Sequence, residues 1–397
     1  MMSVWSSLVG QEAAVAKLSE AAASARVIVA SRGGVHASDD ARSMSHAWLI
    51  TGPPGSGRSV AARAFAAALQ CTGETVGCGQ CAGCRTTMGR TNADVVFAAT
   101  ETSIINVETA RSLVLQAQSS PSQGLWRVIV VEDADRLGES GANALLKAIE
   151  EPPEHTVWLL CAPSPEDMIA TIRSRCRHLG LRIPTAAAVA DLLVREGVAT
   201  PEVALEAARA AQSHIGLARA LARDPQMRER RRAIITAPAS VRSVGEAVMA
   251  ADRLLETAKA QADAQVSERN AREKAELLRQ LGMDEGESAT KASRTMIRQL
   301  EEDQKRRSKR ALTDAIDRAL IDLLAIYRDV LMVQVGGDGE LINTDLADLV
   351  SQIARDSTPR QTLARVDHIE TARKRLVSNG NPLLVLEDMA ISLRPQA

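Results

Sequence analysis

The chain has 397 residues, of which 45% are hydrophobic and 24% charged, and its formal net charge is −1. This length is too great for one hydrophobic core and predicts two or three domains. The near-neutral charge and the aromatic content of 2% exclude bulk attraction to nucleic acid and base-stacking platforms. No apolar run approaches the roughly 20 residues of a membrane helix, and no signal peptide is recognisable. We therefore expect a cytoplasmic protein without membrane contact.

The first 181 residues are expected to form an α/β domain. A helix over residues 10–30 and a loop over 31–45 precede short apolar runs that alternate with helical segments. The predicted strands are 47–51, 94–98, 127–133 and 157–161, and the predicted helices between them are 60–70, 106–119 and 140–151. Continuous apolar runs are typical of strands buried on both faces. The pattern therefore predicts a parallel sheet covered by helices on both sides.

The remainder of the chain is predicted to be helical. Residues 182–225 are expected to form a small helical domain, and residues 226–397 an all-helical one. Within the latter, the segment of about 259–310 is unusually charged: Glu301-Glu302-Asp303 is followed by five basic residues at 305–310. Mixed charges on alternating faces favour a solvated helix or a coiled coil over a binding patch.

A glycine-rich turn over residues 52–59, Gly52-Pro53-Pro54-Gly55-Ser56-Gly57-Arg58-Ser59, lies between a predicted strand and a predicted helix. This is the context of a phosphate-binding loop. Its backbone N–H groups and the helix N-terminus would face an anion, and Ser59 could coordinate Mg²⁺. Arg58 stands where such loops have lysine, and its planar fork does not reproduce the reach of lysine. The loop is therefore either a site for ATP or ADP with Mg²⁺, or a relic that binds nucleotide weakly or not at all.

Two carboxylates end the third predicted strand, as Glu132 followed by Asp133. An active nucleotide hydrolase has aspartate first, to hold magnesium, and glutamate second, to orient the attacking water. The reversed order moves each carboxylate by about one methylene, which is costly where attack geometry is tight. The pair is either catalytic or simply two charges at the end of a strand.

Four cysteines lie within fourteen residues, and two others, Cys161 and Cys176, stand alone. The four are Cys71, Cys78, Cys81 and Cys84. In a reducing compartment such a cluster indicates a metal site rather than disulfides. Thiolates at this spacing can close tetrahedrally on a structural Zn²⁺, and an iron–sulfur cluster is the alternative.

The order of these motifs resembles that of bacterial sliding-clamp loaders, AAA+ subunits of the DNA polymerase III holoenzyme. The resemblance covers most of residues 5–225 and returns at 369–376 and 381–383. The blocks that carry it are Val9-Gly10-Gln11, the glycine-rich turn, the four cysteines, Ala-Leu-Leu-Lys-Ala-Ile-Glu-Glu-Pro-Pro at 144–153 and Thr-Ile-Arg-Ser-Arg-Cys at 171–176. The segments 31–45 and 259–310 match nothing in the family and resemble insertions.

The resemblance implies an architecture and a set of nucleotide-binding residues. It implies an AAA+ nucleotide-binding domain over 1–181 with a zinc module at 71–84, a helical lid over 182–225 and an all-helical collar over 226–397. The implied nucleotide-binding residues are Val9, Gly10, Gln11, Gly52, Gly55, Gly57, Arg58, Ser59, Glu132 and Asp133. As a holoenzyme subunit, the chain need not be an enzyme by itself.

Within the family, departures from the motor pattern favour the delta-prime type over the gamma/tau type. Arg58 and the inverted acidic pair are two of them, and Ala162-Pro163 stands where motor subunits have a polar sensor. If Ser213-His214-Ile215-Gly216 aligns with the Gly-Ser-x-Arg sensor, Gly216 replaces the arginine, although a shifted register would nominate Arg219. We therefore expect little or no ATP hydrolysis by this chain.

Clamp loaders of this family are hetero-pentamers that open the sliding clamp and place it on primer–template DNA. The resemblance implies gamma/tau and delta subunits as partners, with DNA contacted through the assembled complex. It also implies that Arg175 is an arginine finger that reaches a neighbour's ATP in trans; taken alone, Arg175 would be an ordinary surface ion-pair partner. An active gamma/tau-like ATPase motor and an adaptor in another DNA transaction are the alternatives.

Overall fold

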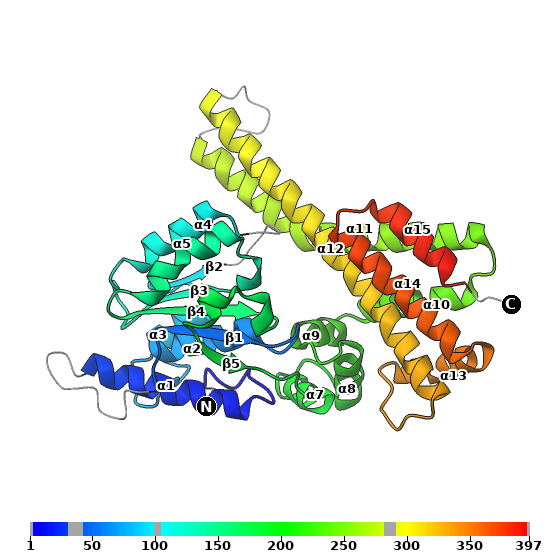
Figure 1. The fold of residues 1–397 in the computed structure, drawn as a ribbon, viewed down its shortest axis with the longest axis horizontal. Helices are drawn as coiled ribbons and strands as arrows, with labels where there is room; N and C mark the ends of the chain where they lie inside the picture. Colours follow the sequence, from blue (N-terminus) through cyan, green and yellow to red (C-terminus); the bar gives the residue numbers. More distant parts are fainter. Residues whose placement is uncertain (1–2, 31–42, 99–104, 282–290, 395–397) are drawn as a thin grey trace. The chain divides into compact units, whose positions relative to one another are not determined.

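The computed structural model describes residues 3–30, 43–98, 105–281 and 291–394, and the chain divides into two compact units, Met1–Ala222 and Arg223–Ala397 (Figure 1). Most of the predicted loop 31–45 lies outside the described residues. The finer division into three domains stays a prediction. Within the described residues, no helix combines the length and the apolar character that a membrane crossing requires.

The first unit contains a five-stranded sheet in the order β2-β3-β4-β1-β5, and every pairing in it is parallel. The strands are β1 (Ala47–Thr51), β2 (Val95–Ala98), β3 (Arg127–Val131), β4 (Thr156–Ala162) and β5 (Arg177–Gly180). Every residue of the central strands β1 and β4 is buried. The predicted parallel sheet is confirmed. The strand β5 has no apolar run, because as an edge strand it is mostly exposed.

Helices cover both faces of this sheet, as predicted (Figure 1). On one face, α1 (Glu12–Ala30) and α2 (Arg58–Leu69) enclose a core that contains Trp48 and Ile50. On the other face, α4 (Val107–Ala117) and α5 (Glu139–Glu150) enclose a core that contains Leu49. Successive residues of β1 therefore serve different cores. The other helices of this unit are α3 (Ala82–Met88), α6 (Ala170–Arg173), α7 (Ala186–Arg195), α8 (Pro201–Ala210) and α9 (Ile215–Arg223).

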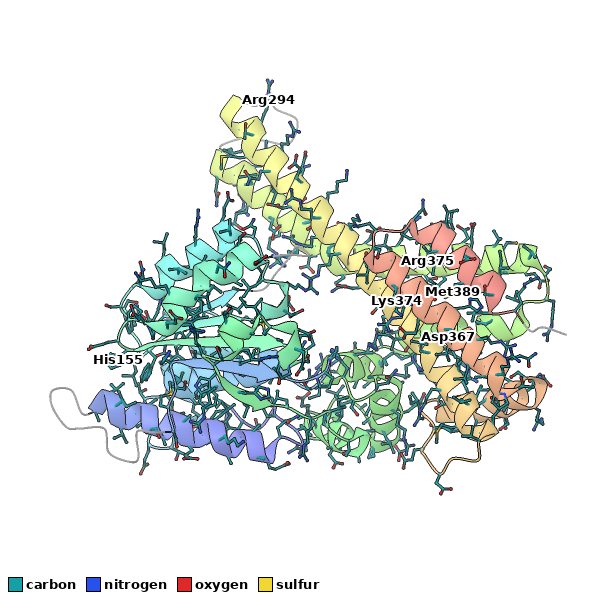
Figure 2. All side chains as sticks on the ribbon, in the orientation of Figure 1. His155, Arg294, Asp367, Lys374, Arg375 and Met389 are labelled. Carbon is teal, nitrogen blue, oxygen red and sulfur yellow. The ribbon has the colours of Figure 1, made fainter. Side chains whose placement is uncertain are left out.

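The second unit is helical throughout its described residues. It contains α10 (Pro225–Ser240), α11 (Val244–Leu281), α12 (Lys291–Gln334), α13 (Ala347–Asp356), α14 (Pro359–Val377) and α15 (Pro382–Ser392). Its core combines α12 with the helices around it, for example Leu320 with Ile369 and Leu386. Two arginines of α14 tie it to neighbouring helices: Arg373 binds Asp317 of α12 at 2.7 Å and Arg375, labelled in Figure 2, binds a carboxylate of α15 at 2.5 Å.

The charged segment forms the distal parts of α11 and α12, which run side by side (Figure 1). A narrow apolar seam of Ala262, Val266 and Ala311 lies between them. Beside it, Arg307 crosses from α12 to α11 and donates to Asn270 at 2.7 Å and Glu273 at 2.8 Å. The described residues of the segment 259–310 are helical, in agreement with the expectation of a solvated helix or a coiled coil.

A buried carboxylate, Asp94, braces the start of β2 against the loop that precedes β3. It accepts backbone hydrogen bonds from Ser122 (2.7 Å), Gln123 (2.8 Å) and Gly124 (2.6 Å). Burial alone would raise the pKa of Asp94, but these donors outweigh burial and hold the pKa below its usual value. The folded state therefore prefers the ionised form.

We expect Asp94→Asn to lower the free energy of unfolding by about 3 kcal/mol at neutral pH, because buried donors lose a charged acceptor. Since the folded pKa is depressed, the stabilisation is complete above the unfolded pKa of about 4 and is lost as the pH falls through the folded value. Urea unfolding of both proteins across pH 2–7 measures this: the difference should shrink on acidification. A constant difference, or an equal loss in the exposed control Glu154→Gln, would contradict it.

Candidate functional site

The carboxyl edge of the sheet gathers the predicted nucleotide-site segments. The glycine-rich turn follows β1, Glu132-Asp133 follows β3 and Pro163 follows β4. Because β1, β3 and β4 are parallel neighbours, these three segments meet at one edge, where ligands bind in open α/β sheets.

The turn over residues 52–59 has the backbone of a tight loop. Gly55 and Gly57 both have φ of 89°, and a Cβ on Gly55 would lie 3.0 Å from the Cα of His214. The Gly52 N–H donates to the Pro163 carbonyl oxygen at 3.1 Å, which ties the turn to β4. Glycine is therefore required at position 55 by backbone conformation and by close approach.

Arg58 begins α2 and folds back on the turn, where its guanidinium donates to the Gly52 carbonyl oxygen at 2.6 Å. The positive charge at the lysine position is thereby bound to the loop itself. Ser59 follows in the first turn of α2. The buried Ser56 hydroxyl has no hydrogen-bond partner among the described residues, so it is the polar group of the turn that a bound phosphate could satisfy.

The segment Val9-Gly10-Gln11 contributes a buried amide that clamps the turn in place. Gln11 donates to the carbonyl oxygens of Ser56 (3.3 Å) and Arg182 (2.5 Å) and accepts from the Arg182 N–H (3.2 Å). Gly10 adopts a φ of 67° immediately before it. Gln11 thus joins the turn to the chain that follows β5.

The acidic pair is engaged by protein groups. Glu132 forms an ion pair with Arg90 at 2.5 Å, and the Arg90 guanidinium lies 5.0 Å above the Phe97 ring. Asp133 precedes a short 3₁₀ turn, where burial and the Asp133 charge raise the pKa of Asp135. The side chain at the magnesium position therefore has a cationic partner that the local sequence does not indicate.

The predicted sensor positions are occupied by a proline and by an ion-paired arginine. Pro163 has no N–H, and its carbonyl oxygen is taken by Gly52. Arg219, the alternative second sensor, binds Glu196 with two hydrogen bonds of 2.8 Å each. Sequence reasoning missed Arg90 as the partner of Glu132 and the approach of His214 to Gly55, because no local pattern links either pair.

Arg175 lies at the opposite edge of the sheet. It precedes β5, whose last residue, Gly180, pairs with Thr51 beside the turn. The extended chain from Arg177 to Gly180 alone spans about 10 Å, longer than an arginine side chain. Arg175 is 39% exposed, forms an ion pair with Glu150 of α5 and donates to the Thr171 carbonyl oxygen at 2.7 Å.

The four clustered cysteines converge, with all four Sγ atoms within 4.8 Å of one another. Cys71 follows α2, and Cys81 caps α3 by accepting from the Cys84 N–H at 3.4 Å. Burial raises the pKa of Cys81, but donors from Cys84 and Thr72 outweigh it and lower the pKa to about 6. These donors thus favour a thiolate at Cys81, whereas burial raises the pKa of the neighbouring Cys84 thiol.

This arrangement fits a tetrahedral zinc site. Zn–S bonds of about 2.3 Å place sulfurs about 3.8 Å apart, and the Sγ atoms of Cys71 and Cys81 are 3.9 Å apart. Cys71 and Cys84 are buried. Among the described residues, no histidine, aspartate or glutamate belongs to this cluster of candidate metal ligands. Such a site has no open position, so it would be structural rather than catalytic.

Comparison with known proteins shows which protein families this chain resembles. The fold is that of an α/β protein with a glycine-rich turn at the carboxyl edge of its parallel sheet. Residues 35–185 match the family model described as DNA polymerase III, delta subunit. The gamma/tau subunit of Mycobacterium tuberculosis (strain ATCC 25618 / H37Rv) is 35% identical over 159 residues, 39% of this chain and 28% of that protein. The delta' subunit of Pseudomonas aeruginosa is 34% identical over 166 residues, 41% of this chain and 51% of that protein.

These matches confirm the predicted resemblance to clamp-loader subunits of DNA polymerase III. They span about half or less of the relatives' length, and identities of 33–37% are shared by delta' and gamma/tau subunits. A solved gamma subunit-related protein of Thermotoga maritima covers 94% of this chain and 98% of its own, with a TM-score of 0.40 and 16% identity. A likeness of that degree does not bear on function.

We expect purified protein to contain one zinc ion per chain and Cys81→Ser to lose it, because three thiolates close the tetrahedron incompletely. Zinc loss should also lower the melting temperature, since binding energy at such sites is folding energy. Elemental analysis and thermal unfolding measure the two effects. Cys176→Ser is the control and should retain zinc; zinc-free native protein, or iron in its place, would contradict the prediction.

Proposed function

We propose that this chain is a clamp-loader subunit of the delta-prime type, with little or no ATP hydrolysis of its own, which supplies Arg175 in trans to a neighbouring subunit's ATP. The named relatives support the clamp-loader part of this proposal. One observation carries the delta-prime part: the two side chains that should meet phosphate and metal, Arg58 and Glu132, are both bound by protein groups.

Binding Mg²⁺ and a terminal phosphate at this site would break two existing interactions of charged side chains. Magnesium would have to displace Arg90 from Glu132, and a terminal phosphate would have to draw Arg58 from the Gly52 carbonyl oxygen. Charge-assisted hydrogen bonds of this kind are worth about 1.5–3 kcal/mol each. Pro163 offers no side-chain donor in compensation. Nucleotide binding by the Gly52–Ser59 turn remains compatible with this, but efficient hydrolysis does not.

Arg175 has the properties that a trans-acting finger needs. It is exposed and lies beyond reach of its own turn, and its guanidinium presents planar donors suited to a phosphate. Its ion pair with Glu150 is solvent-exposed, and such pairs are worth only about 0–1 kcal/mol. A neighbour's phosphate could therefore replace Glu150 at little cost.

The rest of the chain fits the same assignment. We propose a lid over 182–225, a collar over 226–397 that joins gamma/tau and delta subunits into a hetero-pentamer, and a structural zinc knob at 71–84. The sliding clamp and primer–template DNA would be partners of the assembled complex, with DNA contacted through its phosphates. The near-neutral net charge gives no support for DNA binding by this chain alone.

We expect Arg175→Ala to abolish hydrolysis at the one interface to which it contributes, because arginine fingers supply roughly 10³–10⁵ in rate. The measurement is steady-state ATPase activity of the clamp loader reconstituted with this chain. Arg173→Ala, an exposed arginine two residues earlier, is the matched control and should leave the rate unchanged. An unchanged rate for Arg175→Ala in an intact complex would refute the trans role.

An active gamma/tau-like motor is the second candidate, favoured by the tight backbone of the turn and the unpartnered Ser56 hydroxyl. We expect the isolated chain to hydrolyse ATP no faster than its Arg58→Ala or Asp133→Asn variant, because Arg58 and Glu132 are held away from a ligand. Phosphate release by pure protein decides between the candidates. Steady turnover that either substitution abolishes would favour the motor.

A further inference from the structure

The second unit contains a cavity of about 250 Å³ that no part of the proposed function uses. It lies among α10, α12, α13, α14 and the residue that follows α15. Its walls combine apolar side chains, Leu349, Ile353 and Leu393, with polar groups at one side. The two most buried of these polar groups are Arg365 of α14 and Tyr327 of α12.

Arg365 is a buried cation without an anion. It is 7% exposed, and its guanidinium lies 5.8 Å from the centre of the Tyr327 ring. Among the described residues, no carboxylate lies at ion-pair distance and no oxygen accepts a hydrogen bond from it. The buried Arg231 of the same unit, by contrast, binds Asp322 at 3.0 Å. A cation–π contact supplies only part of the stabilisation that an anion would give.

Tyr327 adds a second unpaired polar group to the same cavity. The residue is 4% exposed, and in the described part of the chain its hydroxyl has no hydrogen-bond partner. Burial raises the pKa of Tyr327 to about 12, so the hydroxyl is a proton donor at neutral pH. Buried tyrosine hydroxyls usually have a partner. Two donors without a hydrogen-bond partner among the described residues, Arg365 and Tyr327, therefore line the same cavity.

The charges and walls of the cavity select a class of ligand. Arg242 and Arg365 are positive and Asp356 is negative, so the lining carries one net positive charge. A planar carboxylate matches the guanidinium fork, whereas Asp356 would repel a dianion such as phosphate. The apolar walls favour a hydrocarbon body, and the volume is below that of most sites for drug-sized ligands. We propose that this cavity binds a small monocarboxylate with an apolar body, held by Arg365 and Tyr327.

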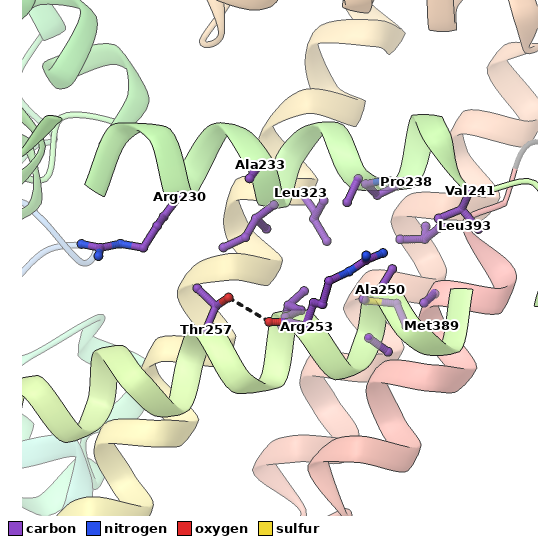
Figure 3. Close-up of a pocket in the computed structure, with 15 residues that line it drawn as sticks. Arg230, Ala233, Pro238, Val241, Ala250, Arg253, Thr257, Leu323, Met389 and Leu393 are labelled. Carbon is purple, nitrogen blue, oxygen red and sulfur yellow. Dashed lines mark hydrogen bonds between the residues drawn. The ribbon is translucent and has the colours of Figure 1, made fainter. Parts of the chain in front are cut away.

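A second cavity of the same unit lacks these features (Figure 3). It measures about 240 Å³ and is lined mainly by alanine, leucine and isoleucine side chains of α10 and α11. Its arginines, Arg230 and Arg253, are exposed and not buried. Apolar contact alone does not define a ligand there, so the proposal is confined to the cavity around Arg365.

The test uses the full chain with sodium butyrate and sodium benzoate as probes, against sodium chloride and sodium phosphate at equal ionic strength. Isothermal titration calorimetry should detect carboxylate binding to the native chain, and thermal unfolding should show a concentration-dependent rise in melting temperature. Arg365→Met should weaken binding roughly tenfold or more, because charged hydrogen bonds are lost. Arg360→Met, an exposed arginine of the same helix, should bind as the native chain does.

Tyr327→Phe keeps the ring beneath Arg365 and should weaken carboxylate binding while leaving the fold intact, which guards against an unfolded Arg365 variant. Equal carboxylate binding by the native chain and Arg365→Met would overturn the proposal. So would the absence of binding to the native chain, or phosphate binding as tight as carboxylate binding. If butyrate and benzoate fail but an acidic peptide of a partner subunit binds through Arg365, the small-molecule assignment is wrong.

Discussion

Parallel pairing of all five strands is the constraint on which the candidate site depends. It places the ends of β1, β3 and β4 at one edge of the sheet, and the chain that precedes β5 at the other. The hydrogen bond from Gly52 to Pro163 fixes the turn at the first edge. Arg175 lies at the second edge, so substitutions in the glycine-rich turn need not affect its position. Under the proposed function, loss of hydrolysis at the first edge would leave the finger at the second edge intact.

Elements whose signal is local were predictable from the sequence. The predicted strand 47–51 agrees with β1, whose five residues, four of them apolar, are all buried as in a parallel sheet. The four cysteines converge because their spacing allows a short excursion to close on itself. The strand β5 gave no such signal: its residues are mostly exposed, and it is extended only because it pairs with β1.

Contacts between distant segments could not be predicted in this way. Arg90 and Glu132 are 42 residues apart, and nothing in either neighbourhood predicts their ion pair. His214 is placed against Gly55 by the arrangement of the helices that follow the sheet. Arg365 and Tyr327 lie on different helices, each within an ordinary helical pattern. Side-chain partners of this kind are set by tertiary packing, so sequence supplies the residue types but not the pairs.

The exposure and the partners of four arginines distinguish those that stabilise the fold from those that can bind an anion from outside the chain. Arg90 and Arg58 are satisfied by groups of their own unit, so they stabilise the site in a form without bound metal or phosphate. Arg175 is exposed and weakly paired, and an exposed pair exchanges readily for a stronger anion. Arg365 lines a cavity and has no ion-pair partner among the described residues. Of these four arginines, Arg175 and Arg365 therefore have the most to gain from an anion supplied by a ligand or a neighbouring chain.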